Sequence, residues 1–352
     1  MTTAVFTGGG TAGHVTPNLA LMKRLLDEGF SISYIGSKGG LEEALVRELG
    51  VPFYGISAGK LRRYASLKNI SDAFRVLKGL LEARKLLIKL KPDVLFSKGG
   101  YVSVPVVLGA KGICPVVCHE SDYSLGLSTK IAARYAKTMC VSFQDTLGML
   151  KREAVFTGSP VRPELYKGNA SKGRALCGFS GEKPVLLVIG GSQGSQAINE
   201  ALSGSLSTLL KKFDIAHICG KGKLCNIAPL KGYVQFEYVT DELKNLLAMA
   251  DIVLSRAGAN TIFELLALKK PNLLIPLPAS SSRGDQLQNA AYFEKKGFSK
   301  VLNQGVLTKE TLSEALNALY LERARYIKQM SECKNADGTE AVLHEIRLAA
   351  KK

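Results

Sequence analysis

Short apolar runs alternate with amphipathic stretches along most of the chain. The apolar runs predict buried strands at residues 4–6, 32–35, 94–96, 116–118, 185–189, 215–218, 234–236, 252–254 and 272–275. Apolar side chains at three- and four-residue spacing predict helices at 17–28, 41–49, 195–212, 240–249, 260–268 and 286–296, and a helical end at 308–351 that is interrupted near 335–338. Strands that alternate with helices are typical of β-α-β units. The pattern therefore predicts an α/β fold with parallel sheets.

A strand, a glycine-rich turn and a helix follow one another twice. Residues 4–13 (AVFTGGGTAG) and 185–194 (VLLVIGGSQG) share the turn pattern Gly-Gly-[Thr/Ser]-x-Gly. This repeat predicts two similar doubly wound domains, and the length of 352 residues agrees with it at roughly 150 residues per domain. A segment rich in proline and glycine at 157–163 interrupts the periodicity, so we expect the boundary near residue 160.

Each glycine turn would aim backbone N–H groups and the positive end of a helix at one point, where phosphate binds. A plain tight turn is the alternative explanation. Residues 8–13 match the dinucleotide pattern G-x-G-x-x-G, but the acidic partner would have to be Asp27 or Glu28, inside the predicted helix. Neither turn has the Lys-Ser/Thr ending of a P-loop. Two turns in equivalent places favour phosphate binding, and a Rossmann-type oxidoreductase is kept as an alternative.

Four residues near the ends of predicted elements have side chains suited to catalysis or binding. His14 closes the first turn, where a neutral imidazole can accept a hydroxyl proton or make a structural hydrogen bond. His119 and Glu120 follow a predicted strand, at the edge where open α/β sheets bind ligands. Glu264 lies early in a helix, where it either complements the helix dipole or accepts the two hydroxyls of a ribose.

Positive charge is concentrated in one segment. The chain has 47 Lys and Arg against 30 Asp and Glu, a net charge of +17, and residues 60–91 hold ten basic residues against two acidic ones. On a helical wheel, the apolar face of this segment is Ile70, Phe74, Leu77, Leu81 and Ile88, and the adjoining basic face is Arg75, Lys78, Lys85 and Lys89. The helix either faces the core with a solvated basic edge or lies on anionic lipid. A nucleic-acid partner is not predicted, because no recognition signature accompanies the charge.

Cysteine usage and hydropathy bear on the compartment. Seven cysteines without a C-x-x-C pair suit a reducing environment, and the closest cluster, Cys114 to His119, is interpreted as a buried strand and not as a metal site. No apolar run reaches the length of a membrane-spanning helix. The N-terminal residues also lack the positively charged region with which a signal peptide begins. We therefore expect a protein of the cytosol or of the inner membrane surface.

Seven motifs, in order along the chain, match those of one known family. They are 8–17 (GGGTAGHVTP), 99–105 (GGYVSVP), 119–122 (HESD), 157–162 (TGSPVR), 190–194 (GGSQG), 255–264 (SRAGANTIFE) and 285–289 (DQLQN). Over its whole length the chain resembles the MurG family, GT-B glycosyltransferases of family 28. These enzymes transfer N-acetylglucosamine (GlcNAc) from UDP-GlcNAc to undecaprenyl-pyrophosphoryl-MurNAc-pentapeptide (lipid I) in peptidoglycan synthesis.

The resemblance implies two Rossmann-like domains facing across a cleft. Residues 1–160 would hold lipid I and associate with the membrane, 161–335 would hold UDP-GlcNAc, and a C-terminal helix at 336–352 would pack on the first domain. In the implied inverting reaction the muramoyl 4-hydroxyl attacks the sugar, UDP leaves and lipid II forms. No cofactor is required, because amides and helix dipoles can take the diphosphate charge, and the sequence does not imply a divalent cation. The implied partners are UDP-GlcNAc, lipid I, an anionic membrane surface and cell-wall synthesis proteins, at the cytoplasmic face of the bacterial cell membrane.

The resemblance also implies residue roles, with either His14 or Glu120 as the catalytic base. The implied donor-binding residues are Thr11, Ala12, Gly13, Arg162, Ser192, Val239, Ala259, Asn260, Glu264 and Gln286. The implied acceptor-side residues are Gly10, Tyr101, His119 and Asp122, and the membrane-facing ones are Ile70, Phe74, Arg75, Leu77, Lys78, Leu81, Lys85 and Lys89. Many members have asparagine where Asp122 stands, and a carboxylate cannot donate the hydrogen bonds of an amide.

Besides the Rossmann-type oxidoreductase, three other functions compete with this interpretation. The closest are another UDP-sugar enzyme of the same fold, either a lipid glycosyltransferase or a UDP-GlcNAc 2-epimerase. The third is a non-catalytic basic protein that binds membrane or nucleic acid. UDP-GlcNAc alone separates the epimerase, which would form N-acetylmannosamine without an acceptor. The non-catalytic protein would release no UDP under any condition.

Overall fold

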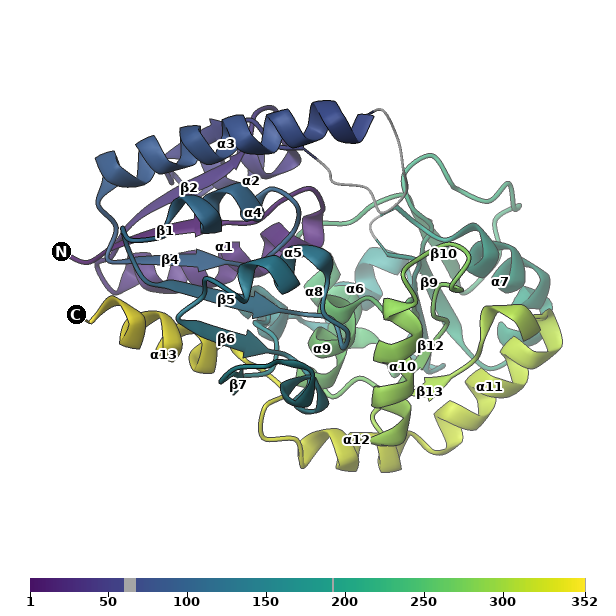
Figure 1. Cartoon of the computed structure of the whole chain (residues 1–352). Helices are drawn as coiled ribbons and strands as arrows, with labels where there is room; N and C mark the ends of the chain where they lie inside the picture. Colours follow the sequence, from purple (N-terminus) through teal and green to yellow (C-terminus); the bar gives the residue numbers. More distant parts are fainter. Residues whose placement is uncertain (60–67, 192, 352) are drawn as a thin grey trace. The chain divides into compact units, whose positions relative to one another are not determined.

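A computed structural model describes residues 1–59, 68–191 and 193–351, apart from the side chains of residue 12 and residues 68–73. The chain forms two compact units, Met1–Val161 with Asp337–Lys352 and Arg162–Ala336 (Figure 1). Each unit holds one sheet whose described strand pairs are all parallel. The prediction of an α/β protein with two Rossmann-like domains is therefore confirmed.

The first unit contains a seven-stranded sheet in the order β3-β2-β1-β4-β5-β6-β7. The strands are β1 (Thr3–Thr7), β2 (Ser31–Ser37), β3 (Phe53–Ile56), β4 (Val94–Ser97), β5 (Val116–Glu120), β6 (Thr138–Val141) and β7 (Val155–Phe156). The chain runs outward from β1 to β3 and then returns to β4 on the other side of β1. Open α/β sheets bind ligands outside the carboxyl ends of their strands at such a reversal. The loops after β1 and β4 therefore meet at the expected ligand position of this unit.

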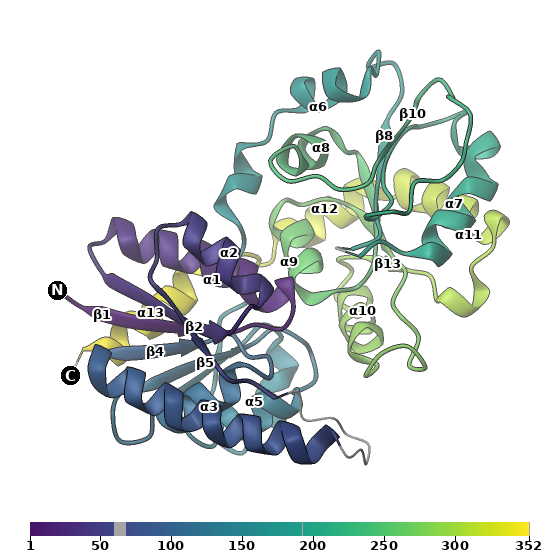
Figure 2. The same ribbon diagram turned by 90° about the horizontal axis from the view of Figure 1, so that it is seen from above.

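Helices cover both faces of the first sheet (Figure 2). They are α1 (Ala12–Asp27), α2 (Leu41–Glu48) and α13 (Thr339–Ala350) on one face, and α3 (Lys68–Leu90), α4 (Ser103–Gly109) and α5 (Leu127–Ala132) on the other. Phe6 and Phe96 pack against the first set, and their neighbours Val5 and Leu95 pack against the second. Because the central strands are buried on both faces, they appear in the sequence as continuous apolar runs.

The last helix, α13, packs on the first unit although the chain reaches it after the second. Val342 and Ile346 are fully buried in the core that contains α1. The guanidinium of Arg347 pairs with the carboxylate of Glu28 at 2.6 Å. The backbone N–H of Gly338 donates to the carbonyl oxygen of Ser159 at 2.9 Å, which holds the start of α13 against the end of the first unit's main segment.

The second unit contains a six-stranded sheet in the order β10-β9-β8-β11-β12-β13. Its strands are β8 (Val185–Ile189), β9 (Asp214–Ile218), β10 (Tyr233–Phe236), β11 (Ile252–Ser255), β12 (Asn272–Leu274) and β13 (Lys300–Val301). Its helices are α6 (Ala170–Cys177), α7 (Gln196–Leu209), α8 (Leu243–Met249), α9 (Ala259–Ala267), α10 (Asp285–Lys295), α11 (Lys309–Leu321) and α12 (Arg323–Ser331). The order reverses between β8 and β11, so the loops after these two strands meet as the loops after β1 and β4 do in the first unit.

All nine predicted strands are present, and the described residues form four further strands that the pattern does not predict. Two of these, β7 and β13, have only two residues each and leave almost no pattern. The predicted helix at 17–28 begins earlier, at Ala12, and contains Pro17 beyond its first turn, whereas proline is typical of a helix start and led the sequence to predict the start there. The predicted helical end at 308–351 is divided into three helices, with breaks at Glu322 and at 332–338.

The face of α3 that the helical wheel could assign to the core is exposed. Phe74, Leu77 and Leu81 are 70%, 58% and 56% exposed, whereas Ala83 and Leu87 are buried and make the core contact. The interpretation of the apolar stripe as core-facing is therefore wrong for these described side chains, while the side chain of Ile70 lies outside the described residues. No helix in the described part of the chain is long and apolar enough to cross a membrane.

Candidate active site

Three loops of the first unit meet because their strands are neighbours. They follow β1, β4 and β5, and contain the motifs at 8–17, 99–105 and 119–122. The turn after β1 fits tightly against the turn after β4. A Cβ on Gly10, where φ is +83°, would clash with the ring of Tyr101, and one on Gly100 would clash with the carbonyl oxygen of Gly9. Only glycine permits this approach, which brings Gly10, Tyr101 and the start of α1 together.

Thr11 and Gly13 are exposed at the first turn of α1, and His14 follows them half-buried. The Nδ1 atom of His14 lies 3.2 Å from the carbonyl oxygen of Lys98. Since a carbonyl oxygen only accepts hydrogen bonds, Nδ1 carries the proton in this contact. The neutral ring then has its basic lone pair on Nε2, which is the protonation state that a general base needs.

Lys98 was not predicted as a site residue. Its buried side chain connects the loops after β4 and β5. Its ammonium group contacts Nδ1 of His119 at 2.9 Å and the hydroxyl of Ser121. Burial lowers the pKa of Lys98 to about 8, although the nearby charges of Glu120 and Asp122 oppose this shift. Its position directly after a buried strand was the available signal, because side chains at carboxyl strand ends reach ligand sites or the loops that form them.

His119 and Glu120 are both buried and support the loop after β5. The Nε2–H of His119 donates to the carbonyl oxygen of Gly158 at 3.0 Å. The carboxylate of Glu120 accepts the backbone N–H groups of Asp122 at 3.1 Å and Gly126 at 3.0 Å, and only 5% of the residue is exposed. The structure therefore gives Glu120 a loop-holding role, while Asp122 is half-exposed at the loop.

Acidification is expected to destabilise the first unit through His119. Burial, and then the positive charge of Lys98, holds the pKa of His119 well below its ordinary value of 6.5. Below about pH 6.5 the unfolded chain takes up a proton at His119 and the folded unit does not. The free energy of unfolding should therefore decrease as the pH is lowered, by up to about 1.4 kcal/mol per pH unit. Urea denaturation followed by circular dichroism from neutral to mildly acidic pH measures this slope. The slope should flatten in His119→Gln and stay unchanged in His344→Gln, which removes an exposed histidine. Equal slopes in both variants would contradict the assignment.

In the second unit, Arg162 and Glu264 form a bidentate ion pair. The guanidinium Nε lies 2.7 Å from one carboxylate oxygen, and its second donor nitrogen lies 2.9 Å from the other. The side chains are 26% and 11% exposed. Such parallel hydrogen bonds fix the plane of the carboxylate. The resemblance assigns both residues to the donor site but does not predict their contact, which joins positions 102 residues apart in the sequence.

Predicted residues on α9 and α10 lie close to the carboxyl edge of the second sheet. Ala259 and Asn260 form the start of α9, in the same helix as Glu264. The side-chain oxygen of Gln286, in the first turn of α10, accepts the backbone N–H of Leu277 at 3.1 Å. Asn289 is buried and its amide donates to the carbonyl oxygen of Ala257, so α10 also holds the turn that leads into α9.

Arg256 is a second residue that was not predicted. It is buried, and it donates to the carbonyl oxygen of Ile275 at 3.0 Å and to the hydroxyl of Ser195 at 2.7 Å. One guanidinium thus joins the ends of β11 and β12 to the N-cap of α7. The motif at 255–264 contains this arginine, but its contacts depend on residues far away in the sequence.

The remaining predicted donor residues are located as follows. The turn at 190–194 leads from β8 to α7, as predicted, and Gly191 has a φ of +89° with open space where a Cβ would be. Ser192 lies outside the described residues. Val239 is half-buried after β10, against the core that contains β8.

Comparisons with known proteins match this geometry. Residues 4–141 match the glycosyltransferase family 28 N-terminal domain, and residues 185–346 match the C-terminal domain of that family. A UDP-N-acetylglucosamine--N-acetylmuramyl-(pentapeptide) pyrophosphoryl-undecaprenol N-acetylglucosamine transferase of Lachnospira eligens is 52% identical over 347 residues, 97% of this chain and 98% of that protein. The protein with the same name in Lachnoclostridium phytofermentans is 51% identical over 350 residues, 98% of this chain and 99% of that protein. The crystal structure of MurG from Acinetobacter baumannii aligns with a TM-score of 0.77 at 26% identity, over 99% of this chain and 100% of that chain.

Proposed function

The chain belongs to glycosyltransferase family 28, and from this membership we propose how its two units share one reaction. The enzyme transfers GlcNAc from UDP-GlcNAc to lipid I, and the products are lipid II and UDP, a step of peptidoglycan synthesis. Relatives that carry this activity in their names and match almost the whole chain support this conclusion. In our proposal the first unit binds lipid I and the second binds UDP-GlcNAc.

The proton acceptor in this proposal is His14. Its Nδ1–H is held by the carbonyl oxygen of Lys98 at 3.2 Å, which fixes the ring with Nε2 as the base. Glu120 is the weaker candidate, because its carboxylate oxygens accept backbone N–H groups of their own loop. Removal of the muramoyl hydroxyl proton by Nε2 would raise the nucleophilicity of that oxygen as it attacks the sugar.

The nucleotide-binding residues in this proposal are on the second unit. Glu264 accepts the ribose hydroxyls, because a carboxylate has about four lone-pair sites and Arg162 occupies two of them. The turn at 190–194, with Ser192, receives the diphosphate at the start of α7. Gln286 binds the GlcNAc hydroxyls, and the backbone at Val239 binds uracil. Amides and helix ends can take the charge of the leaving diphosphate, so no metal is required for this step.

The exposed apolar ridge of α3 and the basic residues beside it would bind the membrane. Phe74, Leu77, Leu81 and Ile88 are more than half exposed, and Arg75, Lys78, Lys85 and Lys89 are exposed next to them. Large apolar side chains beside basic ones are typical of helices that lie in the interface of an anionic bilayer. We therefore propose that the enzyme is peripheral at the cytoplasmic face of the cell membrane, where lipid I and cell-wall synthesis proteins would meet it.

The reaction is tested by measuring UDP release from UDP-GlcNAc with and without a lipid I analogue, together with the mass of the lipid product. We expect release that depends on the acceptor and a lipid that is heavier by one GlcNAc unit. Formation of N-acetylmannosamine without acceptor would replace the transferase by an epimerase.

Glu264→Ala is expected to raise the KM for UDP-GlcNAc about 10- to 100-fold, because hydrogen bonds to a charged group contribute about 1.5–3 kcal/mol. Steady-state kinetics with varied donor measures the change. Glu164→Ala removes an exposed carboxylate of the same unit and should leave the KM unchanged. If Glu264→Ala lowers only the melting temperature, Glu264 is a structural partner of Arg162 and does not bind the ribose.

A further inference from the structure

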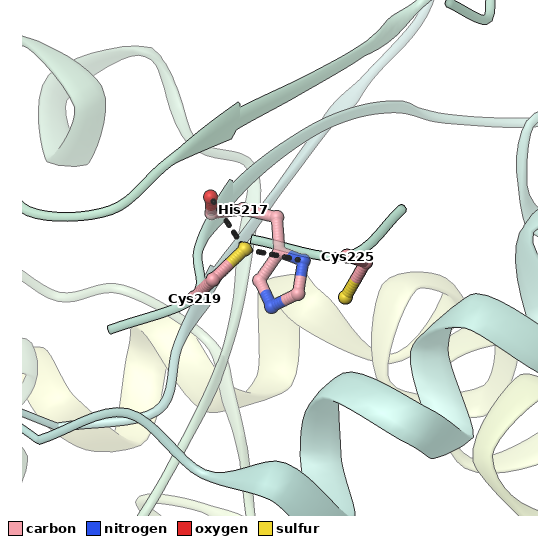
Figure 3. A group of neighbouring side chains, drawn as sticks. All are labelled: His217, Cys219 and Cys225. Carbon is pink, nitrogen blue, oxygen red and sulfur yellow. Dashed lines mark hydrogen bonds between the residues drawn. The ribbon is translucent and has the colours of Figure 1, made fainter. Parts of the chain in front are cut away.

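His217, Cys219 and Cys225 converge in the second unit, at the carboxyl end of β9 and in the segment after it (Figure 3). One possible ligand atom of each residue lies within 4.8 Å of those of the other two. His217 and Cys219 are buried and Cys225 is half-buried. Their spacing, His-x-Cys followed by Cys after five residues, has no C-x-x-C pair, which is why the sequence did not predict the site.

The histidine has the tautomer that a metal ligand needs. Its Nε2 lies 3.0 Å from the side-chain oxygen of Asn199, and it donates there because that oxygen only accepts. Nδ1 then carries the lone pair, and it lies 3.0 Å from the hydroxyl of Tyr233 and 3.4 Å from Sγ of Cys219. The metal ion would therefore take the place of the hydrogen bond that the Tyr233 hydroxyl donates to Nδ1. A second polar group on the distal nitrogen is the usual support of a metal-binding imidazole.

Nδ1 of His217 and Sγ of Cys219 already have the spacing of a tetrahedral site, and Sγ of Cys225 lies within 4.8 Å of both. Bonds of about 2.3 Å to sulfur and about 2.0–2.1 Å to nitrogen place neighbouring ligands roughly 3.5 Å apart, close to the separation of Nδ1 and Sγ. Oxygen donors are also near, since the amide oxygen of Gln235 lies 3.3 Å from Sγ of Cys219 and accepts the backbone N–H of Cys225 at 2.8 Å. The side chain of Gln235 thereby holds Cys219 and Cys225 close to each other.

We propose that His217, Cys219 and Cys225 bind a thiophilic divalent cation, with Zn²⁺ as the best fit. Nδ1 and the two sulfurs are three ligands, and water or the Gln235 oxygen is the fourth. Binding converts both thiols to thiolates and releases two protons, while the metal keeps its oxidation state. Two sulfurs and one imidazole favour Zn²⁺ over the oxygen-binding ions Mg²⁺ and Ca²⁺.

The same segment packs on the glycine turn after β8. A Cβ on Gly194 would clash with the carbonyl oxygen of Cys219, and the ammonium group of Lys223 donates to the carbonyl oxygen of Gln193 at 2.8 Å. Asn199, which supports His217, also donates to the carbonyl oxygen of Cys219 at 3.1 Å. An ion that fixes residues 217–225 would therefore steady this turn. Its effect on UDP-GlcNAc rests on the proposed diphosphate role of the turn, whereas metal binding itself does not.

Cobalt titration of the reduced, metal-stripped full-length enzyme tests the site. One equivalent of Co²⁺ should give a sulfur-to-cobalt charge-transfer band and the intense visible bands of tetrahedral coordination, and Zn²⁺ should abolish both. Cys219→Ser and Cys225→Ser should lose the charge-transfer intensity. Cys177→Ser and Cys333→Ser should keep it, since they remove one buried and one half-buried cysteine of the same unit outside the cluster.

Alkylation of the wild-type enzyme gives a readout that does not depend on whether a variant folds. Zn²⁺ should abolish labelling of Cys225 by iodoacetamide and leave that of Cys333 unchanged. The proposal is overturned if the folded wild type shows no cobalt–thiolate band, if Cys219→Ser keeps the full band, or if the cysteines join as a disulfide and the reduced enzyme binds no cobalt. A bound ion without any change in the KM for UDP-GlcNAc would retain the site and remove only its connection to the turn.

Discussion

His14→Ala is expected to lower kcat by about 100- to 10,000-fold, the usual contribution of a positioned general base. Binding of UDP-GlcNAc should persist, because the nucleotide contacts proposed here belong to the second unit. An imidazole accepts a proton only in its neutral form, so the wild-type rate should fall on acidification. That acid limb should be absent from the residual activity of the variant. Kinetics over a pH series, with donor affinity measured by calorimetry, provides both readouts.

Glu120→Gln separates the two candidate bases. Glutamine retains one acceptor oxygen for the backbone N–H groups of Asp122 and Gly126, so we expect a lower melting temperature and a kcat that changes much less than in His14→Ala. The opposite pattern, with near-normal turnover in His14→Ala and abolished turnover in stably folded Glu120→Gln, would make Glu120 the base.

The central strands could be predicted because they are buried on both faces. In β1, Val5 and Phe6 point to opposite cores and are both fully buried, so the apolar run is continuous in the sequence. The glycine turn after β1 was equally predictable, because the positive φ of Gly10 and the close approach of Tyr101 exclude other residues. Edge strands such as β7 and β13 depend on pairing with a neighbour that local sequence does not reveal.

Site residues that act through distant contacts were the part that the sequence could not predict. Lys98 meets His119 across 21 residues, and Arg256 meets Ser195 across 61. Both cations are buried, and their places are determined by which strands lie side by side. His217, Cys219 and Cys225 are close in sequence, but only the turn after β9 brings Cys225 back to the other two.

Neutralising Arg75, Lys78, Lys85 and Lys89 together is expected to weaken binding to anionic vesicles by about 1,000-fold. Each basic residue near such a surface contributes about 1 kcal/mol, so four contribute about 4 kcal/mol. Flotation with vesicles containing phosphatidylglycerol measures the change. A matched control neutralises Lys172, Lys211, Lys221 and Lys231, which are exposed on the second unit. This control should bind almost as well as the wild type if α3 is the contact.

The apolar ridge of α3 should contribute separately from its charges. Phe74→Ser with Leu77→Ser and Leu81→Ser removes three side chains that are 70%, 58% and 56% exposed, so folding loses little buried surface. This variant should bind less well to anionic vesicles at every salt concentration, whereas the charge variant should differ from the wild type mainly at low salt, because salt screens exposed charges. If the loss is equal in the second-unit control, the net charge of the protein and not the surface of α3 holds it on the membrane.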